Sequence, residues 1–306
     1  LYRDAMAIME RLELESPQKS AGKRNSRIYA DRLCDVYFGL GNVLNANGQN
    51  GQDREIQELD IKRARLQVTV DEQFRAGEPT QAEYQVRLAS SMNQLANAIL
   101  QPDHFDESIA GTMIERAKES LPLLDKAVGL VKPHVGRQPE GTRATERLAR
   151  SHDLCGKAYS FLDDHSHSAD AFAKAAALSQ GDRRSYFRLR QTLAEVHFRP
   201  VDEVIIEFEK RDDPASVKPF YEALVYAVAS GRSDRNAEAY ALRAIELLEQ
   251  ALDSDKAFDE ARESETDEIG ERLTDTWQQH PDLASLRDRD DFKQLIAGSA
   301  AEGETE

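Results

Sequence analysis

Apolar side chains recur three and four positions apart in nearly every long segment of this 306-residue chain, and sustained alternation is almost absent. Spacings of three and four gather side chains on one face of an α-helix, whereas a half-buried strand alternates. Residues 201–211, VDEVIIEFEKR, could pass for a strand, but the rest of the sequence offers no second strand to pair with it. The sequence therefore predicts an all-α protein with a short helix at 201–211.

Turn-forming residues interrupt this helical pattern between the amphipathic segments. The interruptions lie at 48–53, 76–79, 101–106, 132–141, 179–182, 199–200, 211–214 and 230–234. Glycine, proline, aspartate and serine in such positions predict helices joined as antiparallel hairpins. A succession of hairpins is the arrangement in which internal repeats are expected.

Three of the predicted helices share a large residue followed by a small one. These dipeptides are Leu40-Gly41, Leu95-Ala96 and Cys155-Gly156. The residues three positions before and after them are Tyr37, Leu44, Met92, Ile99, His152 and Tyr159. A small residue lets a second helix approach closely while its larger neighbours fill the surrounding space. The second helices carry matching residues at equal spacing, namely Ala110, Ile114, Ala117, Ser168, Phe172 and Ala175.

This pattern resembles the tetratricopeptide repeat, which places an aromatic, a leucine, a small residue and a tyrosine on its first helix. The resemblance implies a TPR-like α-solenoid of antiparallel hairpins, closed by a C-terminal helical cap. We expect repeats over 1–199, with 1–17 the second helix of a truncated repeat. A last repeat and the cap are expected over 200–297, and a disordered acidic tail over 298–306.

Residues 280–296, HPDLASLRDRDDFKQLI, narrow the resemblance further. They are similar to the closing segment of the repeat regions attached to planctomycete-type bacterial serine/threonine protein kinases. In that family, stretches like 83–97 and 148–156 also recur. The resemblance implies a recruiting region of a kinase whose catalytic domain lies upstream of Leu1. The chain itself contains nothing like a kinase glycine loop or catalytic aspartate segment, and its non-methionine first residue leads us to expect a fragment.

Four transition-metal ligands, His152, Cys155, His165 and His167, lie within sixteen positions and raise the question of a zinc site. A helix over 148–162 would place Cys155 roughly 10 to 15 Å from the turn that follows it. Zinc needs its ligands at about 2.0 to 2.3 Å, so helix packing is the preferred interpretation. A metal at the turn alone, held by the two histidines together with Asp163 and Asp164, remains open. We predict no metal, no cofactor and no catalytic residue.

Charge and cysteine content limit the partners and the compartment. The chain has 40 basic and 56 acidic side chains, a net charge of -16, which repels nucleic acid and anionic lipid. Two cysteines, Cys34 and Cys155, cannot form a disulfide framework, which fits either a reducing compartment or a fold that needs no disulfides. The expected compartment is the cytoplasm. No apolar run approaches the ~18 residues of a membrane span. We therefore expect neither nucleic-acid binding nor membrane contact.

The expected function is non-catalytic protein or peptide binding on the concave face of the solenoid. Within the repeat, the position after the small residue points into that groove, and here it carries Asn42, Asn97 and Lys157. Amides and an ammonium can hold the backbone or a carboxylate of an extended peptide. Ordinary surface polarity is an equally weighted alternative for these three residues. The truncated helix at 1–17 also predicts self-association, because its apolar face lacks a partner helix.

Overall fold

The computed structural model describes residues 53–77, 82–100, 110–137, 141–211, 219–260, 277 and 280–302. In these ranges every regular element is a helix, which confirms the predicted all-α class. None of the helices within these ranges has the length and apolar character needed to cross a membrane. The chain divides into two compact units. Unit 1 comprises Leu1–Asp103 and Thr112–Ala158, and unit 2 comprises His104–Gly111 and Tyr159–Glu306.

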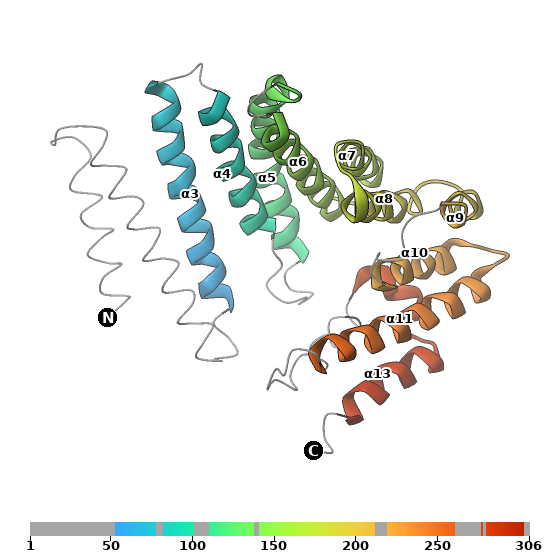
Figure 1. The fold of residues 1–306 in the computed structure, drawn as a ribbon. Coiled ribbons are helices and arrows are strands. Elements are labelled where there is room, and N and C mark those ends of the chain that lie inside the picture. The colour runs from blue at the N-terminus through green and yellow to red at the C-terminus, as the bar shows by residue number, and fades with distance from the viewer. Residues whose placement is uncertain are drawn as a thin grey trace. The chain divides into compact units, whose positions relative to one another are not determined.

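Unit 1 is built from antiparallel helices that run side by side (Figure 1). Its described elements are α3 Asp53–Gly77, α4 Ala82–Leu100, α5 Ala110–Val131, the 3-10 turn η2 Lys132–His134, and α6 Gly141–Phe161. The first two residues of α5 and the last three of α6 belong to unit 2. The central helix is α4, which is buried on most of its circumference and carries apolar or small residues there. Such a helix can exist only when neighbours cover several of its sides.

Polar contacts within unit 1 link α3 to its neighbours. Asp71 of α3 is buried, and its carboxylate accepts hydrogen bonds from Ser91 at 2.6 Å and Gln67 at 3.2 Å. The guanidinium of Arg87 lies 2.9 Å from the other oxygen of Asp71. Burial of this charge is tolerated because both of its oxygens have partners.

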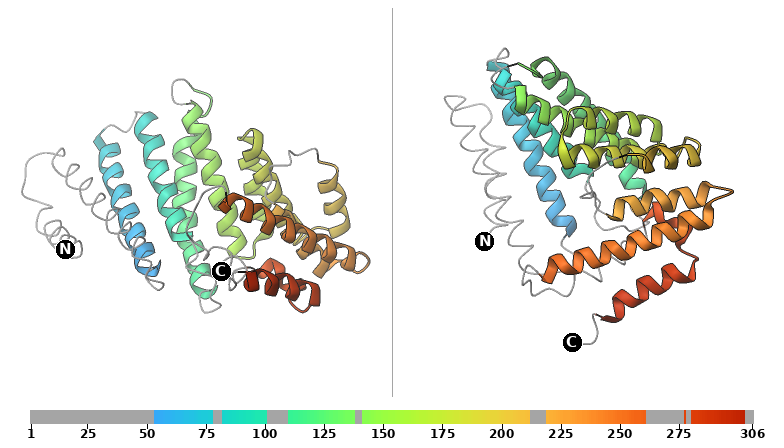
Figure 2. Two further views of the ribbon diagram at one scale, coloured as in Figure 1. Left: turned by 60° about the horizontal axis from the view of Figure 1, so that its bottom comes forward. Right: turned by 45° about the vertical axis from the view of Figure 1, so that its right-hand side comes forward.

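Unit 2 contains the remaining described elements. They are α7 His165–Ala177, α8 Gly181–Glu195, α9 Val201–Glu209, α10 Pro219–Arg232, α11 Ala237–Glu260, the 3-10 segment η3 Pro281–Leu286, and α13 Asp290–Glu302. The short helix predicted at 201–211 is confirmed as α9, which begins directly after Pro200 and buries Val201, Val204 and Ile205. Figure 2 shows α10 and α11 of this unit as an antiparallel pair.

The segment η3 packs on α10 through apolar and small residues. Leu283 and Leu286 are fully buried, and Trp277 stacks on Phe220 with ring centroids 5.5 Å apart. A Cβ atom at Gly231 of α10 would lie 3.1 Å from the Cβ of Ser285, so glycine permits this close approach.

Several predicted boundaries need correction or lie outside the described residues. Helix α6 begins at Gly141, earlier than the predicted 148, because residues 141–147 continue its amphipathic pattern. Helix α13 continues to Glu302, so position 298 lies within a helix rather than at the start of a tail. The helix predicted at 1–17 falls outside the described residues.

Candidate functional site

Two of the three predicted peptide-binding residues belong to one polar cluster in unit 1. Asn97 lies on α4 and Lys157 on α6, and both are partly buried. Arg150 and Asp153 of α6 connect them. We call these four residues the α4–α6 cluster. The third predicted residue, Asn42, lies outside the described residues.

The geometry of the α4–α6 cluster centres on one oxygen of Asp153. Nη1 of Arg150 donates to Oδ2 of Asp153 at 2.5 Å, and Nζ of Lys157 lies 3.5 Å from the same Oδ2. Nη2 of Arg150 donates to Oδ1 of Asn97 at 2.6 Å. The side chain of Asp153 is 1% exposed, whereas Arg150 and Lys157 are 33% and 27% exposed. Oδ1 of Asp153 is buried and has no hydrogen-bond partner.

Helical spacing and a buried hydrogen-bond pair hold the cluster in place. Positions 150, 153 and 157 are three and four residues apart, so their side chains share one face of α6. One turn before the cluster, Nδ2 of Asn93 donates to the carbonyl of Arg147 at 3.1 Å. Ser151, which is fully buried, donates to Oδ1 of Asn93 at 2.9 Å. These buried bonds fix the register between α4 and α6.

The cluster is locally positive although the chain as a whole is strongly negative. Two cations, Arg150 and Lys157, face one carboxylate, Asp153, within a chain of net charge -16. The oxygen of Asn97 is occupied by Arg150, which leaves its NH₂ group as a donor. Partly exposed donors of this kind can bind a carboxylate or a carbonyl.

The residues predicted to pack the repeats occupy varied environments. The buried ones are Met92, Leu95, Ala96, Ile99, Ala117, Cys155, Gly156, Ser168, Phe172 and Ala175. His152 and Tyr159 are partly buried. Ile114 differs from the expectation, since it is 38% exposed on α5. The side chain of Ala110, as well as Tyr37, Leu40, Gly41 and Leu44, lies outside the described residues.

The structure places His165 and His167 in the first turn of α7, not in the preceding turn as predicted. The side chain of Asp164 caps this helix by accepting from the backbone N–H of His167, and Asp163 adopts a positive φ of 56° in the turn. Among the described residues, no three His, Cys, Asp or Glu side chains are grouped closely enough to hold a metal ion.

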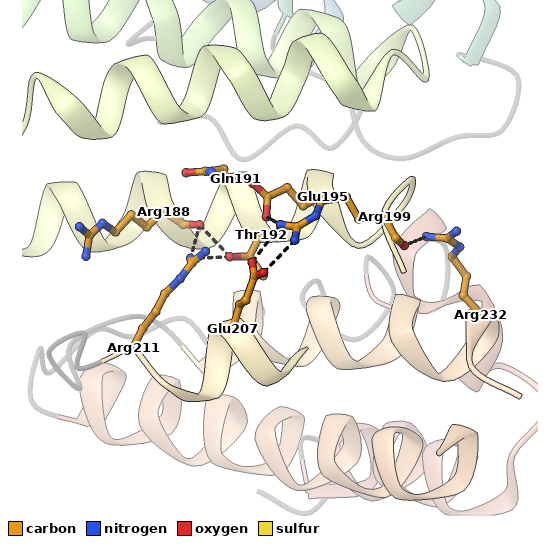
Figure 3. Close-up of polar contacts among 8 residues, drawn as sticks. All are labelled: Arg188, Gln191, Thr192, Glu195, Arg199, Glu207, Arg211 and Arg232. Atoms are coloured by element: carbon orange, nitrogen blue, oxygen red, sulfur yellow. Dashed lines mark hydrogen bonds and ion pairs between the residues drawn. The ribbon is translucent and has the colours of Figure 1, made fainter. Parts of the chain in front are cut away.

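A second polar cluster, the α8–α9 network, lies in unit 2 (Figure 3). Its centre is Arg199, which donates to Glu195 at 2.9 Å and to both oxygens of Glu207 at 2.9 and 3.0 Å. Hydrogen bonding to Glu207 raises the pKa of Arg199, and the same bond lowers the pKa of Glu207. One cation here is held by two carboxylates.

Two further arginines of the α8–α9 network close the C-terminal end of α8. Arg211 donates to the hydroxyl of Thr192 at 2.6 Å and to the carbonyl of Arg188 at 3.2 Å. Arg232, at the end of α10, donates to the carbonyls of Val196 and Arg199. Cations at a helix C-terminus satisfy its last carbonyls and the helix dipole. These contacts indicate a structural role for the network, which joins α8, α9 and α10.

Arg150 and Asp153 are the cluster residues that the sequence interpretation missed. Their only signal in the sequence is the spacing of opposite charges at 150, 153 and 157, and such spacing is common on solvated helix faces.

No protein-family model, no curated protein and no solved structure matches the chain. The assignment of function therefore depends on the geometry of the described residues and on the sequence pattern.

Proposed function

We propose that the chain is a non-catalytic scaffold that binds a protein or an extended peptide at the α4–α6 cluster. The observation that carries this proposal is the sharing of one Asp153 oxygen by two partly exposed cations, Arg150 and Lys157. Asn97 adds a neutral donor beside them. A carboxylate or backbone carbonyl of a peptide has the acceptor oxygens that these donors would hold.

The resemblance to tetratricopeptide repeats supports a peptide as the ligand. Stacked hairpins of that type present first-helix side chains along a continuous groove. In that interpretation α4 and α6 are the first helices of consecutive hairpins, and direct hydrogen bonds between them are in keeping with it. The net charge of -16 disfavours a nucleic acid as the ligand, because phosphates would be repelled over most of the surface.

Peptide selection followed by a binding assay tests the proposal. The full chain would be screened against a random peptide library with free C-termini, and recovered peptides would be labelled for fluorescence anisotropy. We expect Asn97→Ala and Lys157→Ala to weaken binding about tenfold or more, as loss of a charge-assisted or amide hydrogen bond implies. Their far-ultraviolet circular dichroism should match the wild type.

Lys118→Ala is the matched control, because Lys118 is exposed on α5 and pairs with Glu115 of the same helix at 2.9 Å. It should leave the affinity unchanged. Recovered peptides that bind both cluster variants as tightly as the wild type would contradict the proposal, as would an equal loss of affinity in the Lys118 variant.

A second proposal is that this scaffold is the recruiting region of a serine/threonine protein kinase. The resemblance of residues 280–296 to the closing segment of such regions favours it, and these residues form η3 and most of α13. Reading the gene upstream of the codon for Leu1 tests the idea. A glycine-rich loop, a paired lysine and a catalytic aspartate segment are expected, and a frame with helical repeats alone would contradict it.

The proposed compartment is the cytoplasm. Cys155 is a buried free thiol on α6, and a thiol packed as a small apolar residue is in keeping with a reducing environment. Imaging of the tagged full-length protein in cells would test this assignment, and a location outside the cytoplasm would contradict it.

A further inference from the structure

Two histidine rings stack face to face in unit 2, at a place that the proposed ligand site does not use. His165 begins α7, and His197 follows the end of α8; their ring centroids are 3.9 Å apart, with an angle of 7° between the planes. Nε2 of His197 lies 3.1 Å from Oδ1 of Asp282 in η3. We call the two rings the histidine stack. Together with Asp282, the stack connects α7, the segment after α8, and η3.

The surroundings of His165 oppose its protonation. Burial lowers the pKa of His165, and the charge of His197 lowers it further, while Asp163, Asp282 and Asp164 act in the opposite direction. The position of His165 at the start of α7 adds a second cost, because the helix dipole disfavours a cation there. The stack therefore tolerates charge on one ring far better than charge on both.

Asp282 gives His197 a carboxylate partner that remains ionised under acidic conditions. Burial acts to raise the pKa of Asp282, but the hydrogen bond from His197 and the charges of His280, His197 and Arg190 bring it below its ordinary value. On the same segment, burial lowers the pKa of His280, which Asp282 opposes and Arg190 and Arg287 reinforce. Asp282 therefore remains a charged hydrogen-bond partner of His197 at the acidic pH values that matter for the stack.

We propose that the histidine stack is an acid-sensitive contact that holds the first turn of α7 against the segment following α8 and releases it when His165 takes up a proton. The direction follows from proton linkage. In the released state His165 would titrate near its ordinary value of 6.5, whereas the stacked ring takes its proton only at lower pH. The contact is therefore complete above about pH 6.5 and weakens as the pH falls below that value.

Hydrogen exchange of the full chain tests this proposal. Protection factors of the amides of residues 168–172 would be measured at pH 7.5, 6.5 and 5.5, each corrected for the intrinsic exchange rate at that pH. We expect the wild-type protection to fall about tenfold or more between pH 7.5 and 5.5. His165→Phe keeps an aromatic face without a titrating group, and its protection should be independent of pH.

His167→Phe is the matched control, since His167 lies in the same turn but outside the stack, paired with Asp164 at 2.8 Å. It should retain the wild-type fall in protection. His197→Gln provides a second variant that removes the like charge, in case His165→Phe does not fold. Its fall in protection should be smaller than that of the wild type, because burial alone still lowers the pKa of His165. Wild-type protection that is unchanged at pH 5.5, or a fall of wild-type size in both stack variants, would overturn the proposal.

Discussion

The α4–α6 cluster of unit 1 and the contacts of Arg199 in the α8–α9 network of unit 2 combine cations and carboxylates in opposite proportions. In the first, two cations, Arg150 and Lys157, share one oxygen of one carboxylate. In the second, one cation, Arg199, is held by two carboxylates through three hydrogen bonds. Cations therefore outnumber the carboxylate around Asp153, whereas carboxylates outnumber the cation around Arg199.

The difference indicates how to separate a binding site from a structural ion network in a chain with many charges. A cation that is already paired with two carboxylates gains little from an additional acceptor. Removing such a cation should therefore lower stability more than it lowers ligand affinity. Cations that share a single oxygen are poorly neutralised, and an external acceptor can replace that shared contact. Substitutions in the network should therefore lower stability most, and substitutions of the cluster cations should lower affinity most.

The largest effect is expected from Arg199→Met, which removes the cation held by two carboxylates. Glu195 is buried and would lose a charged partner, so the free energy of unfolding should fall by about 2 kcal/mol, allowing for the partial exposure of Arg199. Urea unfolding followed by the fluorescence of Trp277, the only tryptophan of the chain and buried in unit 2, measures this loss. The exposed Arg183→Met is the control, and an equal loss there would remove the special role of the network.

A smaller loss, about 1 kcal/mol, is expected from Asp153→Asn in the α4–α6 cluster. The asparagine oxygen can still accept from Arg150, and both cations are partly exposed and can gain water. Oδ1 of Asp153 has no partner to lose. Unfolding followed by circular dichroism would give the value. A loss as large as that of Arg199→Met would show that the cluster is as structural as the network.

Some features of the fold and of the α4–α6 cluster were predictable from the sequence. The helical class and the short helix at 201–211 follow from the spacing of apolar residues, which is a property of each segment alone. The repeat pattern likewise predicted that the positions of Asn97 and Lys157 would face a common surface, and the structure links them through Arg150 and Asp153.

The rest depends on how helices distant in sequence approach each other. Arg150 reaches Asn97 across 53 positions, and Arg232 reaches the end of α8 from the end of α10. Local periodicity does not specify the rotation and separation of two helices that such contacts need. The α8–α9 network was missed for this reason, although the spacing of Glu195 and Arg199 by four residues is visible in the sequence.

The acid dependence of stability offers a finer test of the network. The hydrogen bond from Arg199 lowers the pKa of Glu207 below its ordinary value of 4.5. The ion pair therefore contributes its full stability above about pH 4.5, and this stability is lost as the pH falls through the lowered pKa. Glu207→Gln should therefore have a lower urea midpoint than the wild type at pH 7. The gap should narrow as the pH falls below about 4.5. A gap that stays constant from pH 7 to pH 3 would contradict the pairing.

The smallest effect on stability, and the most informative one, is expected from Lys157→Met. Its ammonium lies 3.5 Å from Asp153 and is 27% exposed, so the free energy of unfolding should change by less than about 0.5 kcal/mol. Methionine retains an unbranched apolar side chain without the ammonium. Peptide affinity should nevertheless fall about tenfold, because the ammonium is lost as a donor to the ligand.

In Arg199→Met the pattern should be reversed, with stability lowered and affinity retained under conditions where the chain is folded. If Lys157→Met lost stability and kept affinity, the surplus of cations would serve the fold, and the distinction drawn between the two clusters would fail.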